Sequence, residues 1–283
     1  MNAHQWDITR KHLDKIGLCN INDKVLEYIE SGNKKKIKEY CENNIPCINY
    51  NPYNKYCSVI HEGTRYYFTY VDYITSGSYS HVCKWYTESN INIPYGKTLV
   101  SKRVKEEGIK DLEISFVDAF IHSVLYIYQT IMLKKLVKFI VPIRLVTYDK
   151  RRNKLVIFLD YIDHNIYEIL SVKNTSLDIH KKIELAIDTY YQLSCTLELL
   201  QEKLKFVHYD LKGNNIYIFN EKKINSVLLS DFGSSRLVIM DYVISGEEFF
   251  DLSSCFTETR DMYHLIHSTT VFCGPESVYN YLI

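Results

Sequence analysis

A short polar stretch, FVHYDLKGNN at residues 206–215, brings together residue types that could carry out phosphoryl transfer. It contains Asp210, Lys212 and Asn215, and a further carboxylate, Asp231, follows in the sequence SDFG. Phosphoryl transfer requires that phosphates are held, a metal ion is placed and an acceptor hydroxyl is aligned. Mg²⁺ accepts carboxylate and amide oxygens and keeps several of its waters. The stretch therefore predicts a phosphoryl-transfer loop, although a helix end followed by a polar turn would have a similar composition.

The elements that must position these residues fall into two predicted parts. Residues 1–60 predict a helical extension that ends in a turn-rich linker, with a domain boundary near residue 60. The remaining residues, 61–283, predict one further domain. In the first part of this domain, apolar and β-branched residues predict strands at 64–74, 80–88, 98–104, 140–149 and 154–162. One long helix is predicted over 114–139. A helix over 180–204 and a small hairpin then lead through the polar residues.

Four short motifs, in this order along the chain, resemble those of eukaryotic-type serine/threonine protein kinases. TSGSYSHV at 75–82 resembles the glycine loop, and LVSK at 99–102 resembles the V-A-I-K strand. HYDLKGNN resembles the catalytic loop H-R-D-L-K-x-x-N, and SDFG matches D-F-G. The resemblance covers about residues 64–270, and divergent kinases of large DNA viruses are similar in their altered loops and trimmed lobes.

The resemblance implies an α+β, bilobal protein-kinase-like fold. Its small N-lobe, about residues 64–162, would contain five strands and one long helix. Its C-lobe, about residues 163–283, would be mainly helical and curtailed. The implied location is the cytoplasm, or the host cytoplasm or virion if the protein is viral.

The resemblance also implies a role for each matching residue. Lys102 would contact the α- and β-phosphates of ATP, Asp210 would be the catalytic base, and Lys212 would contact the γ-phosphate. Asn215 and Asp231 would hold Mg²⁺. The nucleotide would lie against residues of the glycine loop, the gatekeeper and the hinge, namely Ile74, Thr75, Ser76, Gly77, Ser78, Tyr79, Ser80, His81, Val82, Leu159, Asp160, Tyr161 and Ile162. His208 would be a structural residue of the catalytic loop.

The sequence departs from the kinase pattern in its loops. Gly77 alone stands at a glycine position of the glycine loop, where Thr75 and Ser80 replace the other two. Glycine lets a backbone approach phosphates closely, so slower nucleotide handling is expected. Tyr209 replaces the arginine that pairs with a phosphorylated activation loop, so that form of switching is not expected.

The sequence leaves two assignments with two alternatives each. The helix acid that would pair with Lys102 is Asp118 by position, with Glu113 as the second candidate. Near the end of the chain, RDMYHLI at 260–266 resembles a core helix with a buried aspartate, Asp261. The other reading takes CGPES at 273–277 as the A-P-E motif.

Composition limits the partners that the chain could have. The 34 basic and 34 acidic residues give a formal net charge of zero, which does not imply a nucleic-acid-binding surface. No run of about 20 apolar residues stands out as a membrane span. The eight cysteines are scattered and match no zinc pattern, which favours reduced thiols. The predicted function is ATP- and Mg²⁺-dependent phosphorylation of Ser/Thr in protein substrates; a pseudokinase scaffold and a small-molecule phosphotransferase are the alternatives.

Overall fold

The computed structural model describes residues 1–51, 55–76, 80–88, 98–104, 109–133, 138–171, 174, 176–221, 224–246, 261–262 and 265. The helices are α1 (Ala3–Lys15), α2 (Asp23–Glu30), α3 (Lys34–Asn44), α4 (Ile109–Ile127), α5 (Ile166–Leu170) and α6 (Ile179–Leu204). A π-helical turn, η1 (Tyr128–Met132), continues α4, and a 3₁₀ turn, η2 (Gly213–Asn215), precedes β8.

The strands form one large sheet and two hairpins. The sheet contains β1 (Ile48–Asn51), β2 (Tyr56–His61), β3 (Thr64–Ser76), β4 (Ser80–Tyr86), β5 (Thr98–Val104), β6 (Ile143–Asp149) and β7 (Lys154–Asp160). The hairpins pair β8 (Ile216–Glu221) with β9 (Ile224–Leu229), and β10 (Arg236–Ile239) with β11 (Tyr242–Ser245). All paired neighbours run antiparallel.

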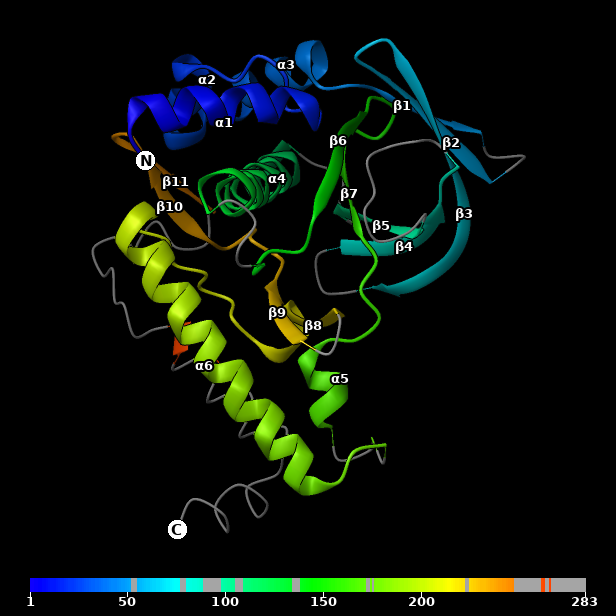
Figure 1. Ribbon diagram of the computed structural model, residues 1–283. Coiled ribbons are helices and arrows are strands. Elements are labelled where there is room, and N and C mark those ends of the chain that lie inside the picture. Colours follow the sequence, from blue (N-terminus) through cyan, green and yellow to red (C-terminus); the bar gives the residue numbers. More distant parts are fainter. Residues whose placement is uncertain are drawn as a thin grey trace.

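The predicted bilobal fold with a five-stranded kinase-like lobe is wrong. The sheet has seven strands, in the order β1-β2-β3-β4-β5-β7-β6, and it curls into a nearly closed barrel (Figure 1). Its two edges meet where Cys47 bridges Tyr148 and where the Tyr148 amide donates to the Pro46 carbonyl at 2.9 Å. The first extra strand, β1, lies in the predicted linker, and the boundary expected near residue 60 falls inside the second, β2.

The barrel closes because residues of β1 and β2 complete its apolar core. Burial alternates along β2, where Cys57 and Val59 are fully buried. They share a core with the stacked rings of Phe68 and Phe158, whose centroids are 4.5 Å apart. The same core contains Ile48, Trp85, Leu99, Leu145 and Val156. Alternation over strands this short is a weak sequence signal, so the sequence pattern favours a turn-rich linker at this place.

The three N-terminal helices lie over α4, on the side opposite to α6 and the β8–β9 hairpin (Figure 1). Asn22 caps α2 by accepting from the Val25 amide, and Val25, Leu26 and Ile29 are buried as their spacing predicts. These helices share one continuous core with α4, α6 and both hairpins. The N-terminal part therefore packs directly against the helix that carries Asp118.

The described residues after β7 contain strands as well as helices. Two hairpins follow α6, where a single one was expected. The apolar stripe of α6 is buried at Leu193, Leu197 and Leu200, whereas Ile187 is 64% exposed. The alternative A-P-E motif, CGPES at 273–277, lies outside the described residues.

One segment of the described chain is apolar and long enough to cross a membrane. It spans Leu112–Ile131, and 78% of it is buried inside the protein. The prediction that no such run exists is therefore wrong by length and composition. Burial in a protein core accounts for the same apolar character.

Candidate active site

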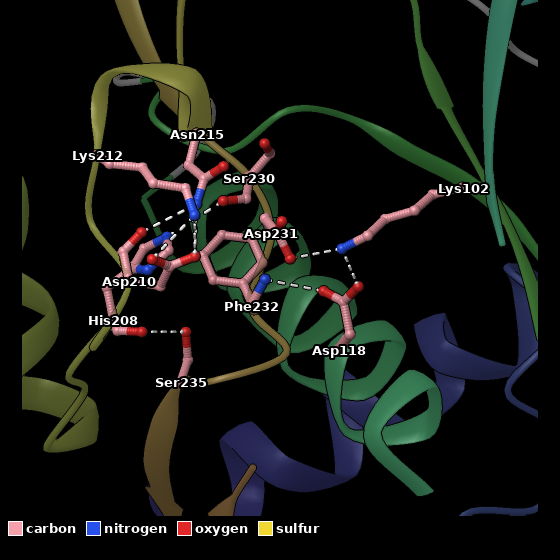
Figure 2. Close-up of polar contacts among 10 residues, drawn as sticks. All are labelled: Lys102, Asp118, His208, Asp210, Lys212, Asn215, Ser230, Asp231, Phe232 and Ser235. Carbon is pink, nitrogen blue, oxygen red and sulfur yellow. Dashed lines mark hydrogen bonds and ion pairs between the residues drawn. The ribbon is translucent and has the colours of Figure 1, made fainter. Parts of the chain in front are cut away.

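Lys102 lies between two carboxylates that come from distant parts of the chain. Its ammonium is 2.6 Å from Asp118 Oδ2 on α4 and 2.6 Å from Asp231 Oδ1, just after β9 (Figure 2). Asp118 is thus the acid that pairs with Lys102. Glu113 instead lies 3.6 Å from the ammonium of Lys34 on α3. The pairing of Lys102 with Asp118, the first of the two alternatives, is confirmed.

The charges of Lys102 and Asp231 stabilise each other's ionised forms. Burial alone would lower the pKa of Lys102, but the charges of Asp118 and Asp231 outweigh it and raise that pKa. Burial would raise the pKa of Asp231, yet the Lys102 ammonium lowers it below its ordinary value. Asp118 is 6% exposed, whereas the Asp231 side chain is 43% exposed and faces solvent. The arrangement presents an ionised carboxylate beside a fixed cation.

The backbone around Asp231 has a conformation that aims its carboxylate at Lys102. Asp231 has a φ of 66°, in the left-handed region that aspartate and asparagine tolerate better than most residues. The next amide, that of Phe232, donates to Asp118 Oδ1 at 2.8 Å. The Phe232 ring is fully buried against His122 and Phe206. Asp118 therefore contacts both the Lys102 ammonium and the backbone of the turn at Asp231 and Phe232.

The loop before β8 gathers Asp210, Lys212 and Asn215 in a second group (Figure 2). The Lys212 ammonium lies 2.8 Å from Asp210 Oδ2. The Asn215 amide nitrogen donates to the carbonyl and to Oδ2 of Asp210, at 2.9 and 3.2 Å. The amide of Ser230 donates to the Asn215 carbonyl at 3.0 Å, which joins this loop to the residue before Asp231. Both predicted groups of residues thus lie at one place.

Asp261 anchors the same loop through hydrogen bonds from the loop backbone. Its carboxylate is fully buried and accepts from the amides of His208 and Tyr209, at 2.7 and 2.9 Å. Tyr209 is buried and has a φ of 62°, so this turn is held against an intrinsic conformational cost. The buried aspartate of RDMYHLI is therefore confirmed. His208 is also buried and donates from Nε2 to the Ser230 carbonyl at 3.1 Å, as a structural residue would.

Removing the Asp261 carboxylate is expected to destabilise the protein by about 3 kcal/mol. In Asp261→Ala the two loop amides lose their acceptors in a buried place, and an unsatisfied buried donor costs about 1–3 kcal/mol. Asp261→Asn keeps one acceptor oxygen and is expected to cost less. Urea unfolding of the three proteins measures the difference. Equal stability of Asp261→Ala and the wild type would contradict the anchoring role.

The predicted nucleotide-contacting residues come from two regions. Ile74, Thr75 and Ser76 end β3, and Ser80, His81 and Val82 begin β4, with Thr75 paired to Val82 and Ser76 to His81. Gly77, Ser78 and Tyr79 lie outside the described residues.

The predicted hinge lies at the end of β7. Leu159 is buried, and Asp160 turns its carboxylate inward to Arg144, whose Nε donates to it at 2.6 Å. The Asp160 amide also donates within the protein, to the Pro142 carbonyl at 2.9 Å. The ammonium of Lys84 lies 3.8 Å from the centroid of the Tyr161 ring. A contact between the side chain of Asp160 and adenine is therefore not available in this arrangement.

Arg144 is a residue near the site that the sequence motifs did not indicate. Its ion pair with Asp160 is buried, with side chains 8% and 2% exposed. Opposite charges within the otherwise apolar segments 140–149 and 154–162 were the signal for a buried pair. By fixing Asp160, Arg144 holds the end of β7 and the start of the predicted hinge.

Acid is expected to destabilise the protein through His122. This histidine is buried next to Phe232, and its Nε2 donates to the Val141 carbonyl at 2.7 Å. Burial lowers its pKa to about 4, so the folded state favours the neutral ring. The stability from this effect is complete above the unfolded pKa of about 6.5 and is lost as the pH falls towards 4, by about 3 kcal/mol in total.

The measurement is urea unfolding between pH 7 and pH 4.5 for the wild type and His122→Gln. Glutamine can still donate to Val141 but does not titrate, so the variant is expected to lose less stability across this window. Identical pH dependence in both proteins would show that His122 is not the responsible group.

The donor chemistry of the site fits a magnesium ion. Asp231 offers a partly exposed carboxylate, and the amide of Asn215 has its nitrogen engaged with Asp210, which leaves its oxygen as the ligand atom. Such a pair of hard oxygen ligands suits Mg²⁺. Across the part of the chain that the structure describes, no three His, Cys, Asp or Glu residues gather into a metal-binding group. The expected pair would not form such a group, since it contains one carboxylate and one amide.

Comparisons with known proteins add no assignment. No family model matches the chain, and no curated protein matches it.

Proposed function

We propose that this protein transfers the γ-phosphoryl group of ATP to serine or threonine hydroxyls of protein substrates. The observation that carries the proposal is the convergence of Lys102, Asp231 and the Asp210 loop from three distant segments of the chain (Figure 2). The proposal rests on these side chains and not on fold class, because one chemistry can be hosted by different folds.

The side chains divide the work as follows. Asp210 accepts the proton of the acceptor hydroxyl while the oxygen of that hydroxyl bonds to the γ-phosphorus and ADP leaves. Asn215 orients the Asp210 carboxylate through its amide nitrogen. Lys102 and Lys212 supply positive charge for the phosphates. Asn215 and Asp231 would hold Mg²⁺, which when bound neutralises charge on the phosphates.

The choice of serine and threonine follows from Lys212. In the kinases that the catalytic loop resembles, a lysine two residues after the aspartate is typical of serine/threonine specificity. Here its ammonium lies against the Asp210 carboxylate, close to where the acceptor would be activated.

A radiolabelled-ATP assay on the protein itself and on generic basic and acidic protein substrates tests the proposal. The wild type is expected to label serine or threonine in the presence of Mg²⁺, and Asp210→Asn is expected to be inactive. Labelling of tyrosine alone would overturn the specificity, and absence of labelling in both proteins would overturn the activity.

The substituted glycine loop favours one alternative, a nucleotide-binding or scaffold module without turnover. Thr75 and Ser80 occupy positions where glycine would let the backbone approach the phosphates. A thermal shift separates the two functions when combined with the labelling assay, because a ligand that binds only the folded protein raises its apparent stability. Stabilisation by Mg²⁺-ATP without labelling would favour the module.

A further inference from the structure

Helix α4 is held from the side opposite to the candidate site. Asp118 faces Lys102 and Phe232. Phe116 lies two residues before Asp118, and Phe120 lies two residues after it. Two residues correspond to a rotation of about 200° around the helix axis, so both rings lie on the face of α4 opposite to Asp118. Both rings are fully buried. Whatever contacts them on the far side therefore sets the position of the Asp118 carboxylate.

Helices α1 and α3 provide those contacts. The Trp6 ring meets Phe120 edge-on with centroids 6.4 Å apart, and Tyr40 meets Phe116 edge-on at 5.4 Å. Trp6 is 2% exposed and Tyr40 is 6% exposed, so both are part of the core. Aromatic pairs of this geometry favour one relative placement of the helices, beyond the area that they bury.

Helix α2 holds a second element of the site. The Glu30 carboxylate accepts from the Val243 amide on β11 at 2.8 Å. The β10–β11 hairpin begins directly after the SDFG segment and returns to it at Gly246, where a Cβ would lie 2.0 Å from the Gly233 carbonyl oxygen. The amide of Gly246 also donates to the Ser235 carbonyl at 3.1 Å. The N-terminal helices thus contact both elements that flank the Lys102 ion pairs (Figure 1).

We propose that helices α1–α3 are a built-in positioning element for the site, with Trp6 and Tyr40 as positioning residues that act through Asp118. The proposal rests on the proposed phosphoryl transfer for its effect on rate, but not for its effect on structure. It also accounts for how the site is held although Tyr209 replaces the arginine of a phosphorylation switch. In this proposal, contacts within the chain set the position of α4.

Hydrogen exchange of the full-length protein tests the structural half of the proposal. Trp6→Leu removes the ring that meets Phe120, and Trp6→Phe restores an aromatic ring. Val59→Ala is the control, because Val59 is fully buried in the separate core of the barrel. In Trp6→Leu the amides of Phe232 and Ser235 are expected to exchange about tenfold faster, with recovery in Trp6→Phe and little change in Val59→Ala. Unchanged exchange at Phe232 in Trp6→Leu, or an equal increase in Val59→Ala, would overturn the proposal.

A double-variant cycle with Asp118→Asn tests the functional half. Trp6→Leu is expected to lower kcat about tenfold in the wild-type background, and to have almost no further effect when Asp118 is already asparagine. Equal effects in both backgrounds would show that Trp6 acts only on general stability. An inactive wild type would reject the proposed function, while the exchange measurement would still decide the positioning role.

Discussion

Replacing Asp231 with asparagine is expected to lower phosphoryl transfer by about three powers of ten without unfolding the protein. The change removes the negative charge that would hold Mg²⁺, and losses of about 10²–10³ are typical when one preorganised electrostatic group is removed. Asparagine is the appropriate replacement because residue 231 has a φ of 66°, which alanine would adopt only with strain. The fold should persist, since Lys102 keeps its pairing with Asp118.

Two further variants make this result specific. Asp210→Asn is expected to be similarly inactive, because it removes the proton acceptor. Asp188→Asn makes the same chemical change on the exposed surface of α6 and is expected to keep full activity. Turnover and thermal unfolding are measured for all three. Wild-type turnover in Asp231→Asn would remove the carboxylate from the mechanism.

Lys102→Met is expected to abolish turnover and also to destabilise the protein. Methionine fills similar space but leaves the carboxylates of Asp118 and Asp231 without the cation that lay 2.6 Å from each. Breaking a buried ion pair costs about 3–5 kcal/mol, and the 43% exposure of Asp231 places the expected loss below that range, at about 2 kcal/mol. Turnover should fall by about 10²–10³. Kinetics with ATP and urea unfolding measure the two effects.

The double variant Lys102→Met/Asp118→Asn separates stability from catalysis. It removes one of the two facing charges, and the asparagine oxygen can still accept from the Phe232 amide. Stability is expected to return towards that of the wild type, whereas turnover should stay low. If Lys102→Met changed neither ATP affinity nor rate, Lys102 would not be the phosphate-contacting residue. Recovery of turnover in the double variant would assign Lys102 a purely structural role.

Much of the candidate site followed from residue types and their order. Lys102, Asp210, Asn215 and Asp231 were selected from short motifs, and the structure brings them together. The buried Asp261 was implied by the resemblance of RDMYHLI to a core helix of kinases, and it is buried in the structure. Such residues are found from sequence because their chemistry demands particular side chains at nearly fixed local spacings. The choice between Asp118 and Glu113 could not be made in this way, since both lie on the same helix and only its rotation decides which carboxylate faces Lys102.

The order of residue types along the chain was enough to predict the polar groups of the candidate site and most of the local helices and strands. Long-range packing was needed to show that β1 and β2 extend the sheet to seven strands and that its edges meet at Cys47 and Tyr148. It also decided that Trp6 and Tyr40 cover α4, and that Arg144 fixes Asp160. The physical reason is that periodicity shows which face of an element is buried, but not which partner buries it. That partner is selected by contacts between residues far apart in the chain.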